Sequence, residues 1–216
     1  MSYKLVIFDM DGTILDTLED LTESVNHALN SEKYPLRSID EIRSFVGNGI
    51  QKLIERSVPH GTTRDNIDKV HKAFTTYYKK HCTDKTKPYR GITELIDKLH
   101  NNGIKTAIVS NKADYAVQEL CIKYFDGKFD IAVGDQLYYK KKPAPDLVNF
   151  VRKELGISEN DTVYIGDSDV DIMTAANSNI DCISVDWGFR SREFLLENGA
   201  NIVVSNVYEL SEILLA

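Results

Sequence analysis

The stretch from Lys4 to Thr13 constrains this chain more than any other, because it joins a buried strand to a pair of acids. Residues 5–8 (LVIF) have the branched and aromatic side chains of a strand in the core of a sheet. Two carboxylates, Asp9 and Asp11, follow one residue apart, and Gly12 comes next. Because burying an unpaired charge is costly, both acids are expected where the strand leaves the sheet, next to a cation.

The acid pair alone allows more than one interpretation. It could be an acidic turn that merely follows a strand. A calcium loop fits poorly, because such a loop has Gly at its sixth position and follows a helix, whereas Gly12 comes fourth here and a strand precedes it. The working hypothesis is a catalytic pair, with Asp9 as the nucleophile and Asp11 as its proton shuttle. The remainder of the sequence has to distinguish this hypothesis from the acidic turn.

The composition is ordinary for a soluble globular protein and argues against several classes of function. Over 216 residues the hydrophobic fraction is 42%, the charged fraction is 27% and the net charge is -7. A general binder of nucleic acid or of anionic membranes would need a basic surface. No apolar run approaches the ~20 residues of a membrane span, and the N-terminus lacks a signal-peptide pattern. The three cysteines are scattered, which indicates neither disulfides nor a zinc site, so a reducing cytoplasm is the expected location.

Behind the opening stretch the periodicity becomes helical. Helices are predicted at about residues 18–29, 38–45, 50–57 and 64–81. Thr17 is the expected N-cap of the first of them, with Asp20 three residues on. No convincing strand is found between Ile14 and Cys82. The segment is therefore expected to be a small helical cap domain, residues 15–83, inserted into a core domain made of residues 1–14 and 84–216.

From Pro88 onward helices and strands alternate regularly. Strands are predicted at residues 104–109, 129–133, 162–165, 181–185 and 201–204, with helices at 91–100, between 112 and 125, at 145–155, and after each of the last three strands. Strands that alternate with helices of this length indicate an α/β fold, in which a parallel, Rossmann-like sheet is covered on both faces.

The unusual polar residues of the sequence fall where such a sheet binds ligands, beyond the carboxyl ends of its strands. Four connections carry them: Asp9 and Asp11 follow the first strand, Ser110 and Asn111 the second, Lys142 the third, and Asp167 and Asp171 the strand at 162–165. These four connections are expected to converge on one rim of the sheet.

The residue types at this rim favour one kind of chemistry. Four carboxylates brought together raise one another's pKa values or require a counter-ion. Magnesium suits a set of oxygen ligands that contains neither His nor Cys. Ser110 offers a hydroxyl, the helix behind it offers backbone N–H groups, and Lys142 adds a positive charge. Together these groups suit a phosphoryl group whose charge must be held during transfer.

Four segments of the chain resemble, in order, the four motifs of the haloacid dehalogenase superfamily of phosphatases. They are residues 9–13 (DMDGT), 110–111 (SN), 142–146 (KPAPD) and 166–171 (GDSDVD), and the resemblance covers nearly the whole chain. The insertion after the first motif is similar to the four-helix cap of that family. Residues 46–49 (VGNG) and 185–190 (VDWGFR) look like the phosphoglycolate phosphatase branch.

The resemblance implies a mechanism that begins at the first motif. Asp9 would attack phosphorus and form an aspartyl-phosphate. Asp11 would protonate the leaving oxygen and then take a proton from the water that hydrolyses the intermediate. The carboxylate of Asp9, the backbone carbonyl of Asp11 and the side chain of Asp167 would bind magnesium.

The other matched residues would support the phosphoryl group and the metal. Ser110 would donate to the phosphoryl oxygens with help from Asn111, and Lys142 would offset the charge of nucleophile and phosphate. Only the family pattern singles out Lys142 from a run of three lysines. Asp171 would orient metal-bound water or Lys142. It can equally be read as a first-turn acid stabilised by the helix dipole, and the two readings are compatible.

The implied function is a magnesium-dependent phosphatase that hydrolyses a small phosphomonoester, with 2-phosphoglycolate as the first candidate. A phosphosugar mutase of the beta-phosphoglucomutase type and a pyrophosphatase would use the same motifs, and a non-catalytic binding protein is a further alternative. Asp11 argues against the dehalogenases, which do not need a general acid two residues after the nucleophile. The expected partner is a small phosphorylated metabolite, with no nucleic acid and no membrane, and the chain is expected to be a monomer or a homodimer.

Overall fold

The computed structural model describes residues 3–216, and the chain divides into two compact units. The larger unit runs over Met1–Leu15 and Pro88–Ala216, and the smaller unit over Asp16–Lys87. The chain passes from the larger unit to the smaller one and back again. The sequence predicted these two boundaries after residues 14 and 83, and in the structure they lie after residues 15 and 87.

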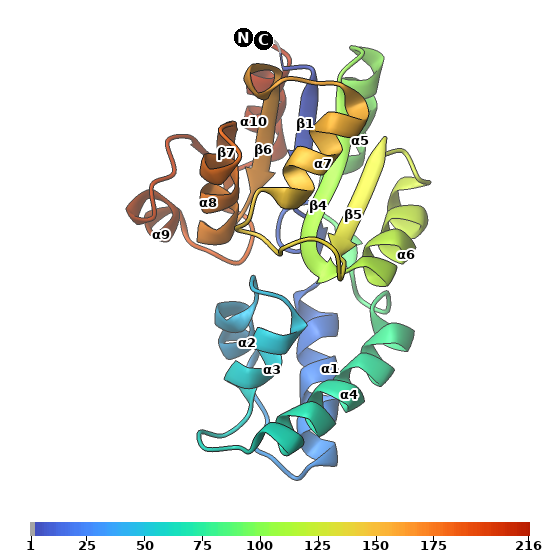
Figure 1. Ribbon diagram of the computed structural model, residues 1–216, viewed down its shortest axis with the longest axis vertical. Helices are drawn as coiled ribbons and strands as arrows, with labels where there is room; N and C mark the ends of the chain where they lie inside the picture. The colour runs from blue at the N-terminus through green and yellow to red at the C-terminus, as the bar shows by residue number, and fades with distance from the viewer. Residues whose placement is uncertain (1–2) are drawn as a thin grey trace. The chain divides into compact units, whose positions relative to one another are not determined.

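The larger unit is built on a parallel sheet, which among the described residues has six strands in the order β5-β4-β1-β6-β7-β8 (Figure 1). The strands are β1 (Leu5–Phe8), β4 (Lys105–Ala113), β5 (Ile131–Asp135), β6 (Thr162–Gly166), β7 (Asp181–Val185) and β8 (Val203–Val204). The prediction of an α/β fold with a parallel sheet is confirmed. The strand β1 lies between β4 and β6, and its four residues are all buried, as an apolar run in the middle of a sheet requires.

Helices cover both faces of this sheet. Apolar side chains of α5 (Ile92–Asn101), α6 (Asp114–Phe125) and α10 (Val207–Leu214) form one core with Val6 and Phe8 of β1. On the other face α7 (Asp146–Leu155) and α8 (Asp169–Asn177) pack with Leu5 and Ile7. Successive side chains of a strand point to opposite faces, so an unbroken apolar strand serves both cores. The remaining elements are a 3-10 turn, η1 (Glu159–Asp161), and α9 (Arg192–Glu197).

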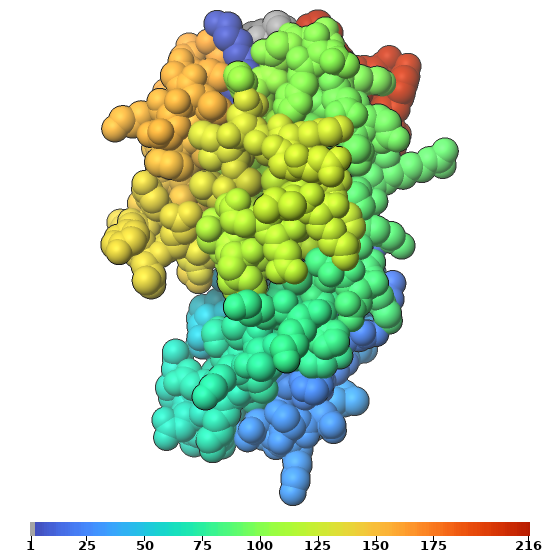
Figure 2. Space-filling model, turned by 90° about the vertical axis from the view of Figure 1, so that its right-hand side faces the viewer, coloured from blue at the N-terminus to red at the C-terminus, as the bar shows by residue number. Residues whose placement is uncertain are grey.

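The connection between β5 and α7 runs from the surface into the core. Figure 2 shows this face of the larger unit, with the connection in yellow to gold. Leu137 is 100% exposed and Tyr138 is 92% exposed, whereas Lys142 is only 5% exposed. The connection therefore carries Lys142 inward while Lys140 and Lys141 stay at the surface.

The smaller unit is helical and consists of α1 (Leu18–Ser31), α2 (Ile39–Phe45), α3 (Ile50–Ser57) and α4 (Arg64–His81). The first and last of these pack against each other. Ser38 opens α2 with a capping box, in which its side chain accepts from the Glu41 N–H and the Glu41 carboxylate accepts from the Ser38 N–H. In the part of the chain that the structure describes, no helix is both long enough and apolar enough to cross a bilayer.

Two short strands mark the crossings between the units. β2 (Leu15–Asp16) and β3 (Lys87–Pro88) pair as a two-stranded sheet. The expectation of no strand between Ile14 and Cys82 is therefore wrong at β2. The sequence did not indicate this strand, because two residues are too few to show an alternating pattern. Thr17 stands at the N-cap of α1, but its side chain makes no capping hydrogen bond.

Candidate active site

Asp9 is the first residue beyond β1, at the carboxyl end of the central strand. Its backbone N–H donates to the carbonyl of Ile165 on β6 at 2.9 Å, and its side chain is buried. The chain then turns back on itself, because the carbonyl of Met10 accepts from the backbone N–H groups of residues 13–15. The strand and this turn together fix where the Asp9 carboxylate lies.

Two glycines allow the turn to approach Asp167. Gly12 has a φ of +83°, and a Cβ at this position would overlap the Asp167 carboxylate. A Cβ on Gly188 would overlap the same carboxylate and the carbonyl of Gly12. Trp187 also packs here, and its Nε1–H donates to the carbonyl of Thr13 at 3.1 Å. The segment around Trp187 therefore closes over the turn that follows β1.

Lys142 lies between two carboxylates. Its Nζ is 2.9 Å from Asp9 Oδ1 and 2.7 Å from Asp171 Oδ1, and it donates to the hydroxyl oxygen of Tyr164 at 2.9 Å. The Tyr164 hydroxyl in turn donates to the carbonyl of Val109 at 2.7 Å. Burial alone would lower the pKa of Lys142, but the carboxylates of Asp171 and Asp9 outweigh it and hold that pKa well above its usual value. Lys142 is therefore a permanent positive charge beside Asp9.

Three buried carboxylates stand close enough to share a cation. Ligand oxygens of Asp9, Asp167 and Asp171 all lie within 4.8 Å of one another. Burial raises the pKa of Asp9 to about 6, against the pull of Lys142. Burial, together with the charges of Asp171 and Asp9, also raises the pKa of Asp167 well above its usual value. A hard divalent cation would lower the pKa values of both carboxyl groups by stabilising their ionised forms, and an all-oxygen donor set fits magnesium.

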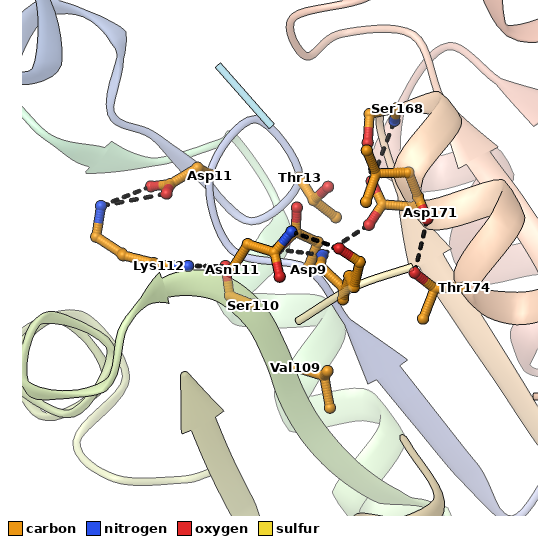
Figure 3. A network of polar contacts seen from close by, with 12 residues as sticks. Asp9, Asp11, Thr13, Val109, Ser110, Asn111, Lys112, Ser168, Asp171 and Thr174 are labelled. Carbon is orange, nitrogen blue, oxygen red and sulfur yellow. Dashed lines mark hydrogen bonds and ion pairs between the residues drawn. The ribbon is translucent and has the colours of Figure 1, made fainter. Parts of the chain in front are cut away.

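Asp171 has both carboxylate oxygens engaged. Oδ1 contacts Lys142, and Oδ2 accepts from the Ser168 N–H at 3.1 Å and from the Ser168 hydroxyl at 2.6 Å (Figure 3). The bond from the Ser168 N–H belongs to the capping box of α8, in which the Ser168 side chain accepts from the Asp171 N–H in return, so Asp171 is also an acid in the first turn of that helix. The sequence offered these two readings of Asp171, and the structure contains both sets of contacts.

Ser110 and Asn111 lie within β4 and not beyond it, which corrects their predicted place. The strand was expected to end at Val109, but it continues to Ala113 after a shift in its register with β5. The helix that follows begins only at Asp114. An irregularity of this kind leaves no mark in the hydrophobic pattern, since the residues beyond it are polar. The backbone N–H groups of that helix therefore do not come directly after Ser110.

Both side chains are nevertheless buried beside the acidic cluster. The Nδ2 of Asn111 donates to the carbonyl of Lys142 at 3.1 Å, which fixes the connection that carries this lysine. The hydroxyl oxygen of Ser110 accepts from the N–H of Lys112 at 3.4 Å. Figure 3 shows both residues next to Asp9.

The side chain of Asp11 is paired with a residue that the sequence analysis did not single out. Lys112 Nζ lies 2.9 Å from Asp11 Oδ1 and 3.2 Å from Oδ2, and the two side chains are 3% and 14% exposed. In Figure 3 they face each other on the side of Asp9 that is away from Asp171. Residues two apart on a strand point to the same face. If the strand had been predicted to extend beyond Val109, the sequence would have placed Lys112 on the same face as Ser110.

Comparison with known proteins gives consistent results. A family profile described as haloacid dehalogenase-like hydrolase matches residues 6–185. Phosphoglycolate phosphatase 1 of Pseudomonas aeruginosa is 28% identical over 212 residues, which is 96% of this chain and 78% of that protein. Phosphoglycolate phosphatase of Psychrobacter arcticus is 34% identical over 199 residues, 88% of this chain and 86% of that protein. A crystal structure from Lactobacillus delbrueckii subsp. bulgaricus, assigned provisionally as a phosphoglycolate phosphatase, has a TM-score of 0.95 and 38% identity over 99% of both chains.

Proposed function

Because this chain belongs to the haloacid dehalogenase-like hydrolases and is a phosphatase of that family, we propose that it hydrolyses a small phosphomonoester with the help of magnesium. The observation that carries the proposal is the position of Lys142, whose ammonium lies between Asp9 and Asp171 in a buried cluster of carboxylates. Such a site balances negative charge within the protein and can accept the further negative charge of a phosphoryl group.

Asp9 is the nucleophile in this proposal. An oxygen of its carboxylate forms a bond to phosphorus while the bond between phosphorus and the leaving oxygen breaks, which gives an aspartyl-phosphate and an alcohol. Water then attacks the aspartyl-phosphate and releases inorganic phosphate and the free carboxylate. The ammonium of Lys142, 2.9 Å from Asp9 Oδ1, supports both steps by offsetting the charge on the transferred group.

Asp11 moves the protons. It gives a proton to the leaving oxygen in the first step and takes one from the attacking water in the second. Its position two residues beyond Asp9, across the turn at Met10, suits a group that has to meet the far side of the phosphoryl group.

The carboxylates of Asp9 and Asp167 and the backbone carbonyl of Asp11 would hold magnesium, with Asp171 beside them. The ion would supply positive charge to the phosphoryl oxygens. The phosphoryl group itself would be bound by the hydroxyl of Ser110, with help from Asn111, and by Lys142. Burial of these three side chains supports this assignment, since a dry site strengthens each contact to the anion.

The proposed substrate is 2-phosphoglycolate. Its support is the naming of the similar proteins as phosphoglycolate phosphatases, including the Psychrobacter relative at 34% identity and the Lactobacillus structure at 38%.

A panel of phosphate esters tests the function, with wild type assayed in magnesium, in chelator, and after magnesium is restored. We expect release of inorganic phosphate from 2-phosphoglycolate, its loss in chelator and its return with magnesium. Asp9→Asn should remove the activity, and Asp68→Asn, at an exposed site on α4, should not. A mutase would instead convert a hexose 1-phosphate to the 6-phosphate in the presence of a bisphosphate activator. Accumulation of the 6-phosphate without free phosphate would overturn the proposed hydrolysis.

A further inference from the structure

Tyr164 lies beside the site, although the mechanism proposed above gives it no part. It belongs to β6, and its side chain is fully buried. Its hydroxyl contacts Lys142 Nζ at 2.9 Å and the carbonyl of Val109 at 2.7 Å. Because β1 lies between β4 and β6, this hydroxyl bridges Lys142 to a strand that does not pair with its own. Val109 directly precedes Ser110, so both partners adjoin groups assigned to the phosphoryl group.

The chemistry of the two partners fixes the direction of both hydrogen bonds. The ammonium of Lys142 can only donate and the carbonyl of Val109 can only accept. The hydroxyl hydrogen of Tyr164 therefore points at Val109, and an oxygen lone pair faces Lys142. Burial also holds the pKa of Tyr164 well above its usual value, so the hydroxyl stays neutral. Tyr164 thus offers Lys142 an acceptor without adding another negative charge to the site.

Lys142 has a need for such a partner, because one of its two carboxylate partners changes during the proposed reaction. When an oxygen of Asp9 bonds to phosphorus, its carboxylate gives up the negative charge that attracts the ammonium at 2.9 Å. Asp171 and Tyr164 do not react. Asp171 is held by the Ser168 hydroxyl at 2.6 Å, and Tyr164 is held by its bond to the backbone of β4. These two partners can keep the ammonium in one place while the phosphoryl group is transferred.

We propose that Tyr164 is a positioning residue, whose hydroxyl holds the Lys142 ammonium in place for the phosphoryl group and ties it to the backbone of β4 directly before Ser110. This role rests on the proposed phosphatase function. Tyr164 itself does not touch the substrate and moves no proton. Its effect on the reaction passes through the position of the Lys142 charge.

The test variant is Tyr164→Phe, which removes the hydroxyl and keeps the ring that lies 5.4 Å from the Lys142 ammonium. The matched control is Tyr3→Phe. Tyr3 is also buried, and its hydroxyl donates to Asp181 at 2.8 Å. Tyr3 precedes β1 and Asp181 begins β7, so this bond lies at the amino ends of the strands, away from the site. Should Tyr164→Phe fail to fold, Tyr164→Met serves the same comparison.

Wild type and both variants are assayed with magnesium on 2-phosphoglycolate and on p-nitrophenyl phosphate. The inhibition constant of orthovanadate is measured as well, because this anion can adopt the five-coordinate geometry of a phosphoryl group in transfer. An inhibition constant does not depend on how much of the protein is folded. It therefore separates a displaced Lys142 from a mere loss of folded enzyme.

Tyr164→Phe should lower kcat by about ten- to a hundredfold, the value of a hydrogen bond to a charged group, and weaken orthovanadate by a similar factor. The loss should be equal on the two esters, because Lys142 serves the phosphoryl group and not the leaving group, and KM should change less than kcat. Tyr3→Phe should leave these constants unchanged.

A lower kcat with an unchanged inhibition constant would mean that Tyr164 serves the fold alone, which overturns the proposal. A loss on one ester only would place the effect at the leaving group and overturn it too. If wild type hydrolyses either ester and Tyr164→Phe behaves like Tyr3→Phe, the phosphatase stands and the role of Tyr164 falls. If wild type hydrolyses neither ester, both fall together.

Discussion

At the scale of single residues, the balance of charge around Lys142 explains how so many acids can be buried together. The ammonium contacts Asp9 and Asp171 directly, and Tyr164 accepts a third hydrogen bond from it. Removing one partner of a buried ion pair is far more costly than the pair itself is favourable, because the other charge stays buried. Lys142 is therefore expected to matter for the fold and for the chemistry alike.

Lys142→Met should lower the phosphatase activity by at least about a hundredfold and the free energy of unfolding by roughly 3–5 kcal/mol. Urea unfolding and steady-state assays measure the two effects. The control is Lys141→Met, because Lys141 is 43% exposed in its pair with Asp135 and should change neither quantity measurably. Near wild-type values for Lys142→Met would contradict the assigned charge balance.

The raised pKa of Asp9 predicts a pH dependence of stability in the metal-free protein. An unfolded Asp loses its proton near pH 4, whereas burial raises the pKa of folded Asp9 to about 6. The stabilisation from the bound proton is thus complete below about pH 4 and is lost as the pH rises through about 6. In chelator, wild type should therefore lose stability as the pH rises, whereas Asp9→Asn, which has no proton to lose at this position, should not. The free energy of unfolding of Asp9→Asn minus that of wild type should increase by roughly 1–3 kcal/mol from about pH 4.5 to 7.5. A difference that stays constant over this range would exclude the raised pKa.

At the scale of elements, the accuracy of sequence-based prediction followed how regular each element is. The strand β1 was predictable because its apolar run is unbroken, and α1 to α4 were predictable because their apolar residues recur at helical spacing. The end of β4 was not, because its register with β5 shifts between Val109 and Ala113. That one difference moved Ser110 and Asn111 into a strand and kept Lys112 out of the predicted site.

The beginning and the end of the smaller unit are joined through Asp20 of α1. Its buried carboxylate accepts from the Lys85 N–H at 3.0 Å, and from the N–H and the hydroxyl of Thr86 at 2.9 and 2.7 Å. The sequence suggested a capping role for Asp20, since it lies three residues after Thr17. The actual partners lie more than sixty residues away in the sequence, so no local pattern could have identified them.

Asp20→Ala should lower the free energy of unfolding by roughly 2–3 kcal/mol, because it removes the carboxylate that accepts from the Lys85 N–H and from the buried N–H and hydroxyl of Thr86. Glu23→Ala is the control, since it removes only the exposed ion pair with Lys85 and should leave the stability unchanged. Chemical denaturation of both variants measures the difference. Equal stability of the two variants would show that the bonds of Asp20 do not hold the ends of this unit together.

At the scale of the whole molecule, the parallel sheet explains why residues from four distant segments form one site. The carboxyl ends of β1 and β6 bring Asp9 and Asp167 together, the connection after β5 adds Lys142, and β4 adds Ser110. The sequence predicted this convergence from the order of strands and helices alone. It could not predict that Asp11 would be paired with Lys112, because the contact depends on the direction of two side chains.

The central claim is that phosphate passes through Asp9, and reductive trapping tests it most directly. Wild type is mixed with 2-phosphoglycolate and magnesium, quenched in acid and treated with borohydride, which reduces an acyl phosphate to an alcohol. Peptide mass spectrometry should then find homoserine in place of Asp9, and no change in protein that received no substrate. Reduction at a different carboxylate, or an unmodified Asp9 in protein that is turning over, would contradict the account.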